Sequence, residues 1–345
     1  MKTILVTGGA GFIGSNFVHH IFNQYPDYRI LVLDLLTYAG SVDNLPTDFK
    51  DAHASGRIEF WYGDVRNASL VENLMRRVDV VVHFAAETHV TRSIFDNYHF
   101  FETDVLGTQV ISNAVLRCAD RIERFVHIST SEVYGTAEAP LMNEEHPLKP
   151  LSPYASAKCG ADRLVYSYWA TYHLPAVIVR PFNNFGPRQH LEKAVPRFIT
   201  SCLLDEPLRL HGQGAAQRDW LFVADTCDAI DRIVHAPREA VVGEVINIGT
   251  DHSLSVAEVA HHIVRLMDKP ESLITYVGER PGQVFRHTAD AAKARRVLGW
   301  QPSVTFEQGL QKTIDWYRTH RSVWEKQLWM REIPIVTGSG KAELH

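Results

Sequence analysis

The sequence predicts an α/β protein in which a doubly wound parallel sheet is joined to a smaller α+β lobe. Two observations lead to this prediction. Short apolar, β-branched runs alternate with amphipathic stretches through the first 180 residues, which is typical of a parallel sheet with helices on both faces. A glycine-rich loop follows the first run and opens a helical pattern, and this is the order of a Rossmann-type βαβ unit.

The expected elements follow one another regularly up to residue 180. The predicted strands cover residues 3–7, 30–33, 58–62, 78–83, 125–129 and 176–180, and the helical patterns lie near 15–22, 69–77, 98–118 and 153–173. Beyond this point the less regular elements are helices at 195–205, 255–268, 290–298 and 306–319 and isolated strands at 208–211 and 245–248. We therefore predict three parts: a first domain of 1–180 with part of 221–250, a lobe of 181–220 and 251–333, and a tail of 334–345.

Composition excludes several classes of protein. The chain has 345 residues, of which 45% are hydrophobic, and its 35 basic and 40 acidic residues give a net charge of −5. This balance argues against a nucleic-acid binder, which usually shows a basic face. The longest apolar runs are only strand-sized, so no transmembrane helix is expected. Met1 leads directly into a strand without a signal sequence, and the four scattered cysteines fit neither a disulfide framework nor a metal site. These features predict a cytoplasmic protein without a metal.

The glycine-rich loop predicts a dinucleotide site. Gly8, Gly11 and Gly14 let the backbone turn tightly and let a pyrophosphate approach the helix N-terminus, where free N–H groups favour anions. Asp34 ends the second strand twenty residues after Gly14, where its carboxylate would accept hydrogen bonds from a ribose diol and repel a 2′-phosphate. NAD is therefore expected rather than NADP. The loop residues assigned to the cofactor are Gly8, Gly11, Phe12, Ile13 and Gly14.

Two later strand ends provide further candidate cofactor contacts. Asp64 and Val65 follow the third strand and would suit the edge of the adenine. Ala85 and Ala86 follow the fourth strand and are small enough to let the backbone pass close to a cofactor. Ordinary turn and packing chemistry is the alternative explanation for all four residues.

A catalytic group is predicted from two segments. Residues 129–135 read Ser-Thr-Ser-Glu-Val-Tyr-Gly at a strand end, and Tyr154 and Lys158 open a helix four residues apart. Residues at this spacing share one helix face, and an ammonium near a phenol lowers the pKa of the phenol so that it can act as a base. Thr130 can hydrogen-bond the same reacting hydroxyl.

At this point the chain resembles the extended short-chain dehydrogenase/reductases, and within them the dTDP-glucose and related nucleotide-sugar 4,6-dehydratases. The resemblance spans nearly the whole length. The segments that carry it most specifically are Leu-Thr-Tyr-Ala-Gly at 36–40, Ala-Ala-Glu-Thr-His-Val-Thr-Arg-Ser-Ile at 85–94, Asn-Asn-Phe-Gly-Pro at 183–187, Gln-Arg-Asp-Trp at 217–220 and the run from Leu298 to Phe306.

The resemblance implies a tightly held NAD that is reduced and reoxidised within one turnover, and a nucleotide-diphosphate sugar as the substrate. Tyr154, with Lys158, would take the proton from the sugar O4 during oxidation at C4. The resulting 4-keto group acidifies the C5 proton, which Glu132 would remove as water leaves C6. Reduction at C6 then gives a 4-keto-6-deoxy sugar. A simple 4-epimerase needs no such carboxylate, so Glu132 favours a dehydratase.

One position departs from the dTDP-glucose enzymes. They have Thr-Asp-Glu, in which the Asp is thought to protonate the leaving hydroxyl, whereas this chain has Ser131 between Thr130 and Glu132. Thr-Ser-Glu is similar to GDP-mannose 4,6-dehydratases, N-acetylhexosamine dehydratases and UDP-glucuronate decarboxylases. Two candidates remain for the acid at C6, a second role of Glu132 or a water held by Ser131. The alternative reactions are C4 epimerisation and decarboxylation, and Ser-Pro-Tyr at 152–154 weakens the second.

The resemblance also implies substrate contacts and an assembly. The residues expected to bind the nucleotide sugar are Thr88, Asn183, Lys193, Arg218, Asn247 and Arg280. Val284 and Phe285 change the polarity near the expected nucleotide end, which argues against dTDP as the nucleotide. The nucleotide base and the hexose both stay open. Helical stretches 98–118 and 153–173 resemble those of a four-helix interface and imply a homodimer. A NAD-binding sensor without turnover is a further hypothesis, and the presence of Thr130, Tyr154 and Lys158 argues against it.

Overall fold

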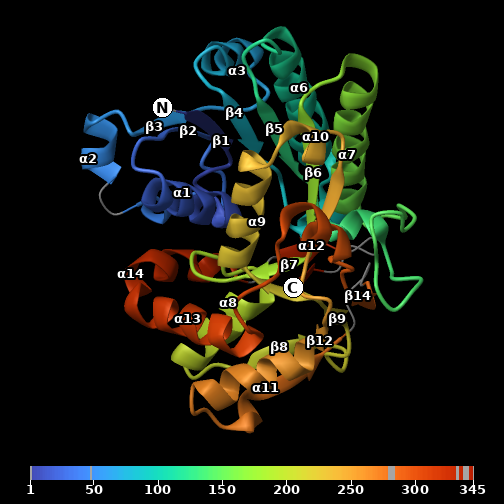
Figure 1. Cartoon of the computed structure of the whole chain (residues 1–345). Coiled ribbons are helices and arrows are strands. Elements are labelled where there is room, and N and C mark those ends of the chain that lie inside the picture. Colours follow the sequence, from blue (N-terminus) through green and yellow to red (C-terminus); the bar gives the residue numbers. More distant parts are fainter. Residues whose placement is uncertain (1, 47–48, 279–283, 332–333, 337–341, 345) are drawn as a thin grey trace.

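The computed structural model describes residues 2–46, 49–278, 284–331, 334–336 and 342–344. Its centre is a seven-stranded sheet in which every neighbouring pair is parallel, in the order β3-β2-β1-β4-β5-β6-β11 (Figure 1). This confirms the predicted doubly wound α/β fold. The strands are β1 (Thr3–Thr7), β2 (Arg29–Asp34), β3 (Ile58–Tyr62), β4 (Val80–His83), β5 (Arg124–Ile128), β6 (Ala176–Pro181) and β11 (Val245–Ile248).

Helices cover both faces of the sheet, and its central strands are therefore buried on both sides. Along β1, Ile4 and Val6 belong to the core on one face, whereas Leu5 belongs to the core on the other. This alternation follows from the two-residue period of a strand. The first face is covered by α1 (Phe12–Gln24), α9 (Val223–His235) and α12 (Ala292–Leu298), and the second by α3 (Ala68–Met75), α6 (Thr108–Arg117) and α7 (Pro153–Tyr172).

The strand predicted at 245–248 pairs with β6 at the edge of the main sheet. The helix predicted at 290–298, which we assigned to the lobe, packs as α12 on the sheet through Ala294. The division of the chain into two domains stays a prediction, although the contacts of α12 place this helix with the sheet. Spacing along the chain does not show that the chain leaves the lobe and comes back to the sheet at α12. Only tertiary contacts decide which core a short helix joins.

The helical stretch predicted at 98–118 is interrupted. It begins as α5 (Tyr98–Phe100), widens into the π-helical turns η2 (Phe101–Gly107) and continues as α6. In the widened part, the buried Asp104 accepts a hydrogen bond from the Glu87 backbone N–H at 2.8 Å. π-helical turns often lie at functional sites, and this one brings a carboxyl group close to the end of β4.

The smaller lobe has a separate core. Three short sheets, the parallel pairs β7–β10 and β8–β13 and the group β12-β9-β14, lie beside helices with apolar inner faces (Figure 1). The lobe's elements are β7 (Asn183–Phe185), α8 (Ala194–Leu203), β8 (Leu208–His211), β9 (Gln217–Arg218), β10 (Trp220–Phe222), β12 (Leu254–Ser255), α11 (Val256–Leu266), β13 (Ile274–Val277), β14 (Arg286–His287) and α13 (Phe306–Thr319).

Local sequence explains where two of these helices begin. Ser255 and Glu258 form a capping box at the start of α11, and Thr305 and Gln308 form another at the start of α13. In each box, two backbone N–H groups that lack a helical partner are satisfied by side chains. Both helices therefore begin within a residue or two of the predicted positions.

The remaining elements connect or end the chain. They are η1 (Val42–Asn44), α2 (Phe49–Ala54), α4 (Val90–Phe95), η3 (Ser131–Tyr134), α10 (Arg238–Val241), η4 (Glu271–Leu273), α14 (Arg321–Trp324), η5 (Glu325–Met330), β15 (Pro334–Val336) and β16 (Ala342–Leu344). β15 and β16 pair in antiparallel fashion, whereas we expected an irregular tail there. Within the described ranges, no helix has the length and apolar character needed to cross a membrane.

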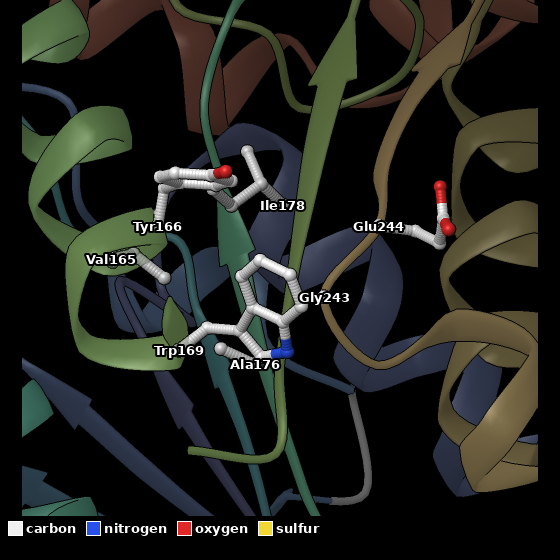
Figure 2. Close-up of a pocket in the computed structure, with 7 residues that line it drawn as sticks. All are labelled: Val165, Tyr166, Trp169, Ala176, Ile178, Gly243 and Glu244. Carbon is white, nitrogen blue, oxygen red and sulfur yellow. The ribbon is translucent and has the colours of Figure 1, made fainter. Parts of the chain in front are cut away.

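A surface hollow lies at the edge of the sheet beside α7. Figure 2 shows the Trp169 ring against the chain at Gly243, with Tyr166 next to Ile178 and the Glu244 carboxylate pointing away. A side chain at Gly243 would overlap the Trp169 ring, and the φ of +88° at this residue also favours glycine. None of the predicted site residues lines this hollow, so it is a packing feature of α7.

Candidate active site

The glycine loop forms a cradle with no room for side chains. Gly8 has φ +69°, and a Cβ there would lie 2.6 Å from the Ala85 backbone nitrogen. A Cβ on Gly14 would overlap the carbonyl oxygen of Gly8. Gly11 begins α1 without a side-chain cap, and the first turn, from Phe12 and Ile13 onward, contains no acidic residue. Its N–H groups and the helix dipole can therefore bind an anion such as a pyrophosphate.

Asp34 lies at the carboxyl end of β2, beside this cradle. Its carboxylate accepts hydrogen bonds from the backbone N–H groups of Ala10 at 2.9 Å and Leu36 at 2.8 Å. Burial raises the pKa of Asp34, and these two bonds oppose the rise. A carboxylate has about four acceptor positions, so the group keeps the capacity to accept bonds from a ribose diol. Cradle and carboxylate together fit a dinucleotide.

The other predicted cofactor residues lie at the same edge of the sheet, after β3 and β4. The Asp64 carboxylate binds the Arg66 guanidinium at 2.7 Å. Burial would raise the pKa of Asp64, but the bonds from Arg66 outweigh it and lower this pKa. Val65 is buried, and the Ala85 N–H donates to the Thr7 hydroxyl at 3.3 Å. The roles of these residues and of Ala86 toward a cofactor stay predictions.

The catalytic candidates Thr130, Ser131 and Glu132 follow β5 at this edge. The Thr130 hydroxyl accepts a hydrogen bond from the Glu132 N–H at 3.2 Å and so caps the 3-10 turn η3. The turn ends at Gly135, where φ is +71° and a Cβ would overlap the Lys149 carbonyl oxygen. This tight geometry buries Ser131 and leaves the Glu132 side chain 19% exposed.

Tyr154 and Lys158 lie on one buried face of α7, as their spacing predicted. Burial raises the pKa of Tyr154, and a hydrogen bond with Thr130 opposes the rise. The Lys158 ammonium donates to the Ile128 carbonyl oxygen at 2.7 Å. Burial lowers the pKa of Lys158, which the nearby Asp104 counteracts. The expected lowering of the phenol pKa by the ammonium is therefore not observed, because burial dominates at Tyr154.

The predicted substrate residues lie on different elements and bond to different parts of the chain. The Lys193 ammonium donates to the Thr88 carbonyl oxygen at 2.9 Å, and Asn183 is half-buried on β7. Arg218 is buried on β9 and donates to the Val284 carbonyl oxygen at 2.9 Å. Burial lowers the pKa of Arg218, and the Glu132 charge opposes this. The structure thus brings the guanidinium into the electrostatic field of Glu132.

The side chain of Asn247 does not bond to any of the other predicted substrate residues in the described part of the chain. Its side-chain nitrogen donates to the Met142 carbonyl oxygen at 2.9 Å, and its side-chain oxygen accepts from the Tyr134 hydroxyl at 2.7 Å. Both ends of the amide are thus engaged inside the core, so its assignment to a diphosphate stays a prediction. Arg280 lies outside the described residues.

Sequence reasoning missed two buried groups. Burial raises the pKa of Asp104 to about 8, and one of its carboxyl oxygens has no hydrogen-bond partner within the described part of the chain. His287 lies beside Ser131 and Glu132, with its Nδ1 3.4 Å from Oγ and 3.7 Å from Oε1. The predicted residues Arg280, Val284 and Phe285 lie in the same segment, but no prediction extended to His287. No sequence pattern distinguished Asp104 from an ordinary helix residue.

The fold and site together define a class. A dinucleotide cradle lies at the point where the strand order reverses between β1 and β4, and a Thr-Tyr-Lys group follows at the same sheet edge. This is the arrangement of an extended short-chain dehydrogenase/reductase. The chain belongs to the GDP-mannose 4,6 dehydratase family, whose model matches residues 5–313.

Relatives cover nearly the whole chain. The low-salt glycan biosynthesis protein Agl12 of Haloferax volcanii is 45% identical over 314 residues, which are 91% of this chain and 98% of that protein. A dTDP-glucose 4,6-dehydratase of an Actinoplanes species is 40% identical over 326 residues, or 93% of this chain and 99% of that protein.

A solved structure agrees with this assignment. The dTDP-glucose 4,6-dehydratase DesIV of Streptomyces venezuelae, with NAD and TYD bound, matches with a TM-score of 0.88 and 40% identity. The match covers 94% of this chain and 99% of DesIV. These findings confirm the predicted 4,6-dehydratase over the 4-epimerase and decarboxylase alternatives.

Proposed function

We propose that this chain removes water from a nucleoside-diphosphate hexose and gives a 4-keto-6-deoxyhexose, with NAD as the cofactor. The observation that carries the proposal is the position of Glu132. This carboxylate lies two residues after Thr130, and its charge acts on both Tyr154 and Arg218. A base for C5 and a base for O4 thus belong to one site, which dehydration requires and epimerisation does not.

The residues of the cradle would hold NAD. Gly8, Gly11 and Gly14 open the space for its pyrophosphate, and Asp34 would accept hydrogen bonds from a ribose diol. Bound NAD supplies a reversible oxidant for C4. The relatives' structure with NAD supports this choice, since DesIV shares the fold over nearly its entire length.

Tyr154 would take the proton from the sugar O4. Its hydroxyl bonds with Thr130, which fixes the direction of the phenol. Because burial raises the pKa of Tyr154, the phenolate needs a nearby cation when it forms. Lys158, four residues along the same helix face, supplies that cation if its ammonium turns from the Ile128 carbonyl toward the phenol.

Glu132 would take the proton from C5, which the neighbouring keto group acidifies. The charge of this carboxylate acts on the Arg218 guanidinium, and Glu132 would serve as the base for the C5 proton. Arg218 would also hold a diphosphate oxygen, and Thr88, Asn183, Lys193 and Asn247 are the other described substrate candidates. Because DesIV was solved with thymidine diphosphate, a thymidine nucleotide is the first substrate to test.

The test is incubation with dTDP-, UDP-, GDP- and CDP-hexoses in deuterated water, followed by mass spectrometry. We expect one nucleotide sugar to lose one water and to gain deuterium at C5. Glu132→Gln should lower this elimination by ~10²–10⁴-fold, the usual contribution of a general base, and should leave C4 oxidation measurable as NADH.

The matched control is Glu138→Gln. Glu138 is exposed and pairs only with surface Lys149 among the described ion pairs, so its variant should keep wild-type turnover. An unchanged mass with an inverted C4 would instead indicate an epimerase. Loss of carbon dioxide from a uronic acid would indicate a decarboxylase.

We also propose a cytoplasmic homodimer. The four cysteines are unpaired, which suits a reducing compartment. η2 and α7 pack against each other and carry large apolar side chains that are exposed in one copy of the chain. These side chains, Phe101, Leu106, Tyr166 and Tyr172, support a second copy as the partner of this surface.

A further inference from the structure

His287 lies against the proposed catalytic turn η3 and contacts Ser131, Glu132 and Gly135. It lies on β14, paired in register with Arg218 on β9, and its side chain has no exposed area. Its Nδ1 lies 3.4 Å from the Ser131 hydroxyl oxygen and 3.7 Å from a Glu132 carboxylate oxygen. One ring nitrogen therefore faces both residues whose roles at the C6 leaving group were open.

The other ring nitrogen determines the tautomer. His287 Nε2 lies 2.6 Å from the Gly135 carbonyl oxygen. A carbonyl oxygen can only accept a hydrogen bond, so Nε2 must carry the proton. In the neutral ring, Nδ1 is then unprotonated and accepts a hydrogen bond from the Ser131 hydroxyl.

The surroundings favour this neutral form at rest. Burial lowers the pKa of His287, and the charges of Arg218 and His146 act in the same direction. Glu132 and the bond to Gly135 oppose them, and the Phe182 ring lies edge-on to the imidazole. A neutral imidazole between a carboxyl group and a hydroxyl can accept a proton on Nδ1 and pass it on.

We propose that His287 relays the C5 proton from Glu132 through Ser131 to the leaving C6 hydroxyl. This inference rests on the proposed dehydration. Glu132 takes the C5 proton, and the C–H electron pair forms the C5=C6 bond. The carboxyl proton moves to Nδ1 of His287 and then to Ser131 Oγ. The original Ser131 proton goes to the C6 oxygen, which leaves with the C–O electron pair as water.

All three side chains return to their starting protonation states in this sequence. Ser131 alone could not donate the proton to the leaving hydroxyl, because the alkoxide that it would become is too basic. It needs a partner that gives it a new proton. His287 supplies that partner. It acts through Ser131 rather than on the sugar itself, so it is a positioning residue for proton transfer.

The relay is tested by changing the leaving group. The variant is His287→Gln, whose side-chain NH₂ can still donate to the Gly135 carbonyl but which cannot carry a proton between its neighbours. Elimination is measured on the panel hexose with the fastest turnover and on its 6-deoxy-6-fluoro analogue. Fluoride leaves without full protonation, so the analogue needs no relay.

We expect His287→Gln to slow elimination of water by ~10²-fold and to change elimination of fluoride by less than about two-fold. Ser131→Ala should show the same selectivity, because it breaks the relay at its next member. Glu132→Gln should slow both substrates, since both need C5 proton removal. His262→Gln is the control, because His262 on α11 contacts Arg265 and Phe306, and it should leave the ratio of the two rates unchanged.

Equal slowing of both substrates by His287→Gln would show a merely structural role and would overturn the proposal. An unchanged rate of water loss would overturn it as well. If the wild-type protein eliminates from neither substrate, the proposed dehydration itself fails. That result is distinct, because the relay can fail alone only where wild-type elimination is seen.

Discussion

At the scale of single residues, the cofactor loop depends on positions where no side chain fits. Gly14 lies inside α1, where alanine would ordinarily improve helix stability by about 1 kcal/mol. At this position the methyl group would instead overlap the Gly8 carbonyl oxygen. The loop would have to move, and with it the helix N-terminus that receives the pyrophosphate.

Gly14→Ala should therefore weaken NAD binding by at least ~10-fold, which is about 1.4 kcal/mol. Isothermal titration calorimetry with NAD measures the change. Gly278→Ala is the control, because a Cβ at Gly278 meets no atom within 4 Å. Equal affinity of Gly14→Ala and wild type would mean that the loop does not hold the cofactor.

At the scale of elements, α1 and α9 are joined across one face of the sheet by an acidic residue. Asp231 on α9 accepts hydrogen bonds from His20 at 2.8 Å and Tyr25 at 3.0 Å, and it pairs with His235 at 2.8 Å. Burial would raise the pKa of Asp231, but its histidine bonds outweigh this and hold the pKa well below the usual range. The bond to Asp231 raises the pKa of His235.

Asp231→Asn should lower the free energy of unfolding by about 1–3 kcal/mol, as expected for hydrogen bonds to a charged group. The part of this free energy that comes from Asp231 is present above the unfolded pKa of about 3.9. It is lost as pH falls toward the lowered folded pKa. The share from His235 is present below about pH 6.5 and is lost as pH rises through the raised folded pKa.

The difference between wild type and variant should thus be larger near about pH 6 than near about pH 8. Urea denaturation at the two pH values measures it. Asp228→Asn is the control, because Asp228 forms an exposed pair with Arg232 and should cost at most about 0.5 kcal/mol. A penalty that grows with pH would contradict the assignment.

At the scale of the whole molecule, the surface formed by η2 and α7 exposes several large apolar side chains. Leu106 on η2 is 51% exposed, and Tyr166 on α7 is 41% exposed. A stable interface usually covers about 800 Å² per partner, which two neighbouring helices can provide. A second copy would then bury these side chains against the same helices.

Leu106→Arg with Tyr166→Arg should convert a dimer into a monomer, since two buried, unpaired charges would enter each half of the interface. Light scattering over a range of protein concentrations measures the mass. Trp329→Arg changes a 78% exposed side chain on η5 and should leave the dimer intact. A monomeric wild-type mass would contradict the proposed assembly.

Much of the sheet could be predicted because each of its strands is encoded by a short, continuous stretch of sequence. The first and third strands, β1 and β3, have the predicted bounds. β1 is buried along its whole length and reads as a short aliphatic run, as is typical of a central parallel strand. The glycine loop, Asp34 and the pair Tyr154 and Lys158 were found for a similar reason. Each lies at a fixed distance from a strand end, and the carboxyl ends of parallel strands meet at one edge.

Other features could not be predicted, because they depend on contacts between distant segments. The π-helical turns that carry Asp104 fall inside a pattern that fits one continuous helix. The lowering of the Tyr154 pKa was expected from spacing alone, whereas burial reverses its direction. Spacing gives proximity along a helix, but the solvation of a group depends on everything packed around it.

The sequence by itself thus determined the α/β fold, the dinucleotide loop and the Thr-Ser-Glu and Tyr-Lys groups, because periodicity and short motifs encode local geometry. Only the tertiary structure decided that α12 joins the sheet and that Asn247 is engaged in the core. It also decided that His287 lies against Ser131 and Glu132, 155 positions after Glu132 in the chain. Such a contact arises when β14 pairs with β9, and no local pattern of residues fixes that pairing.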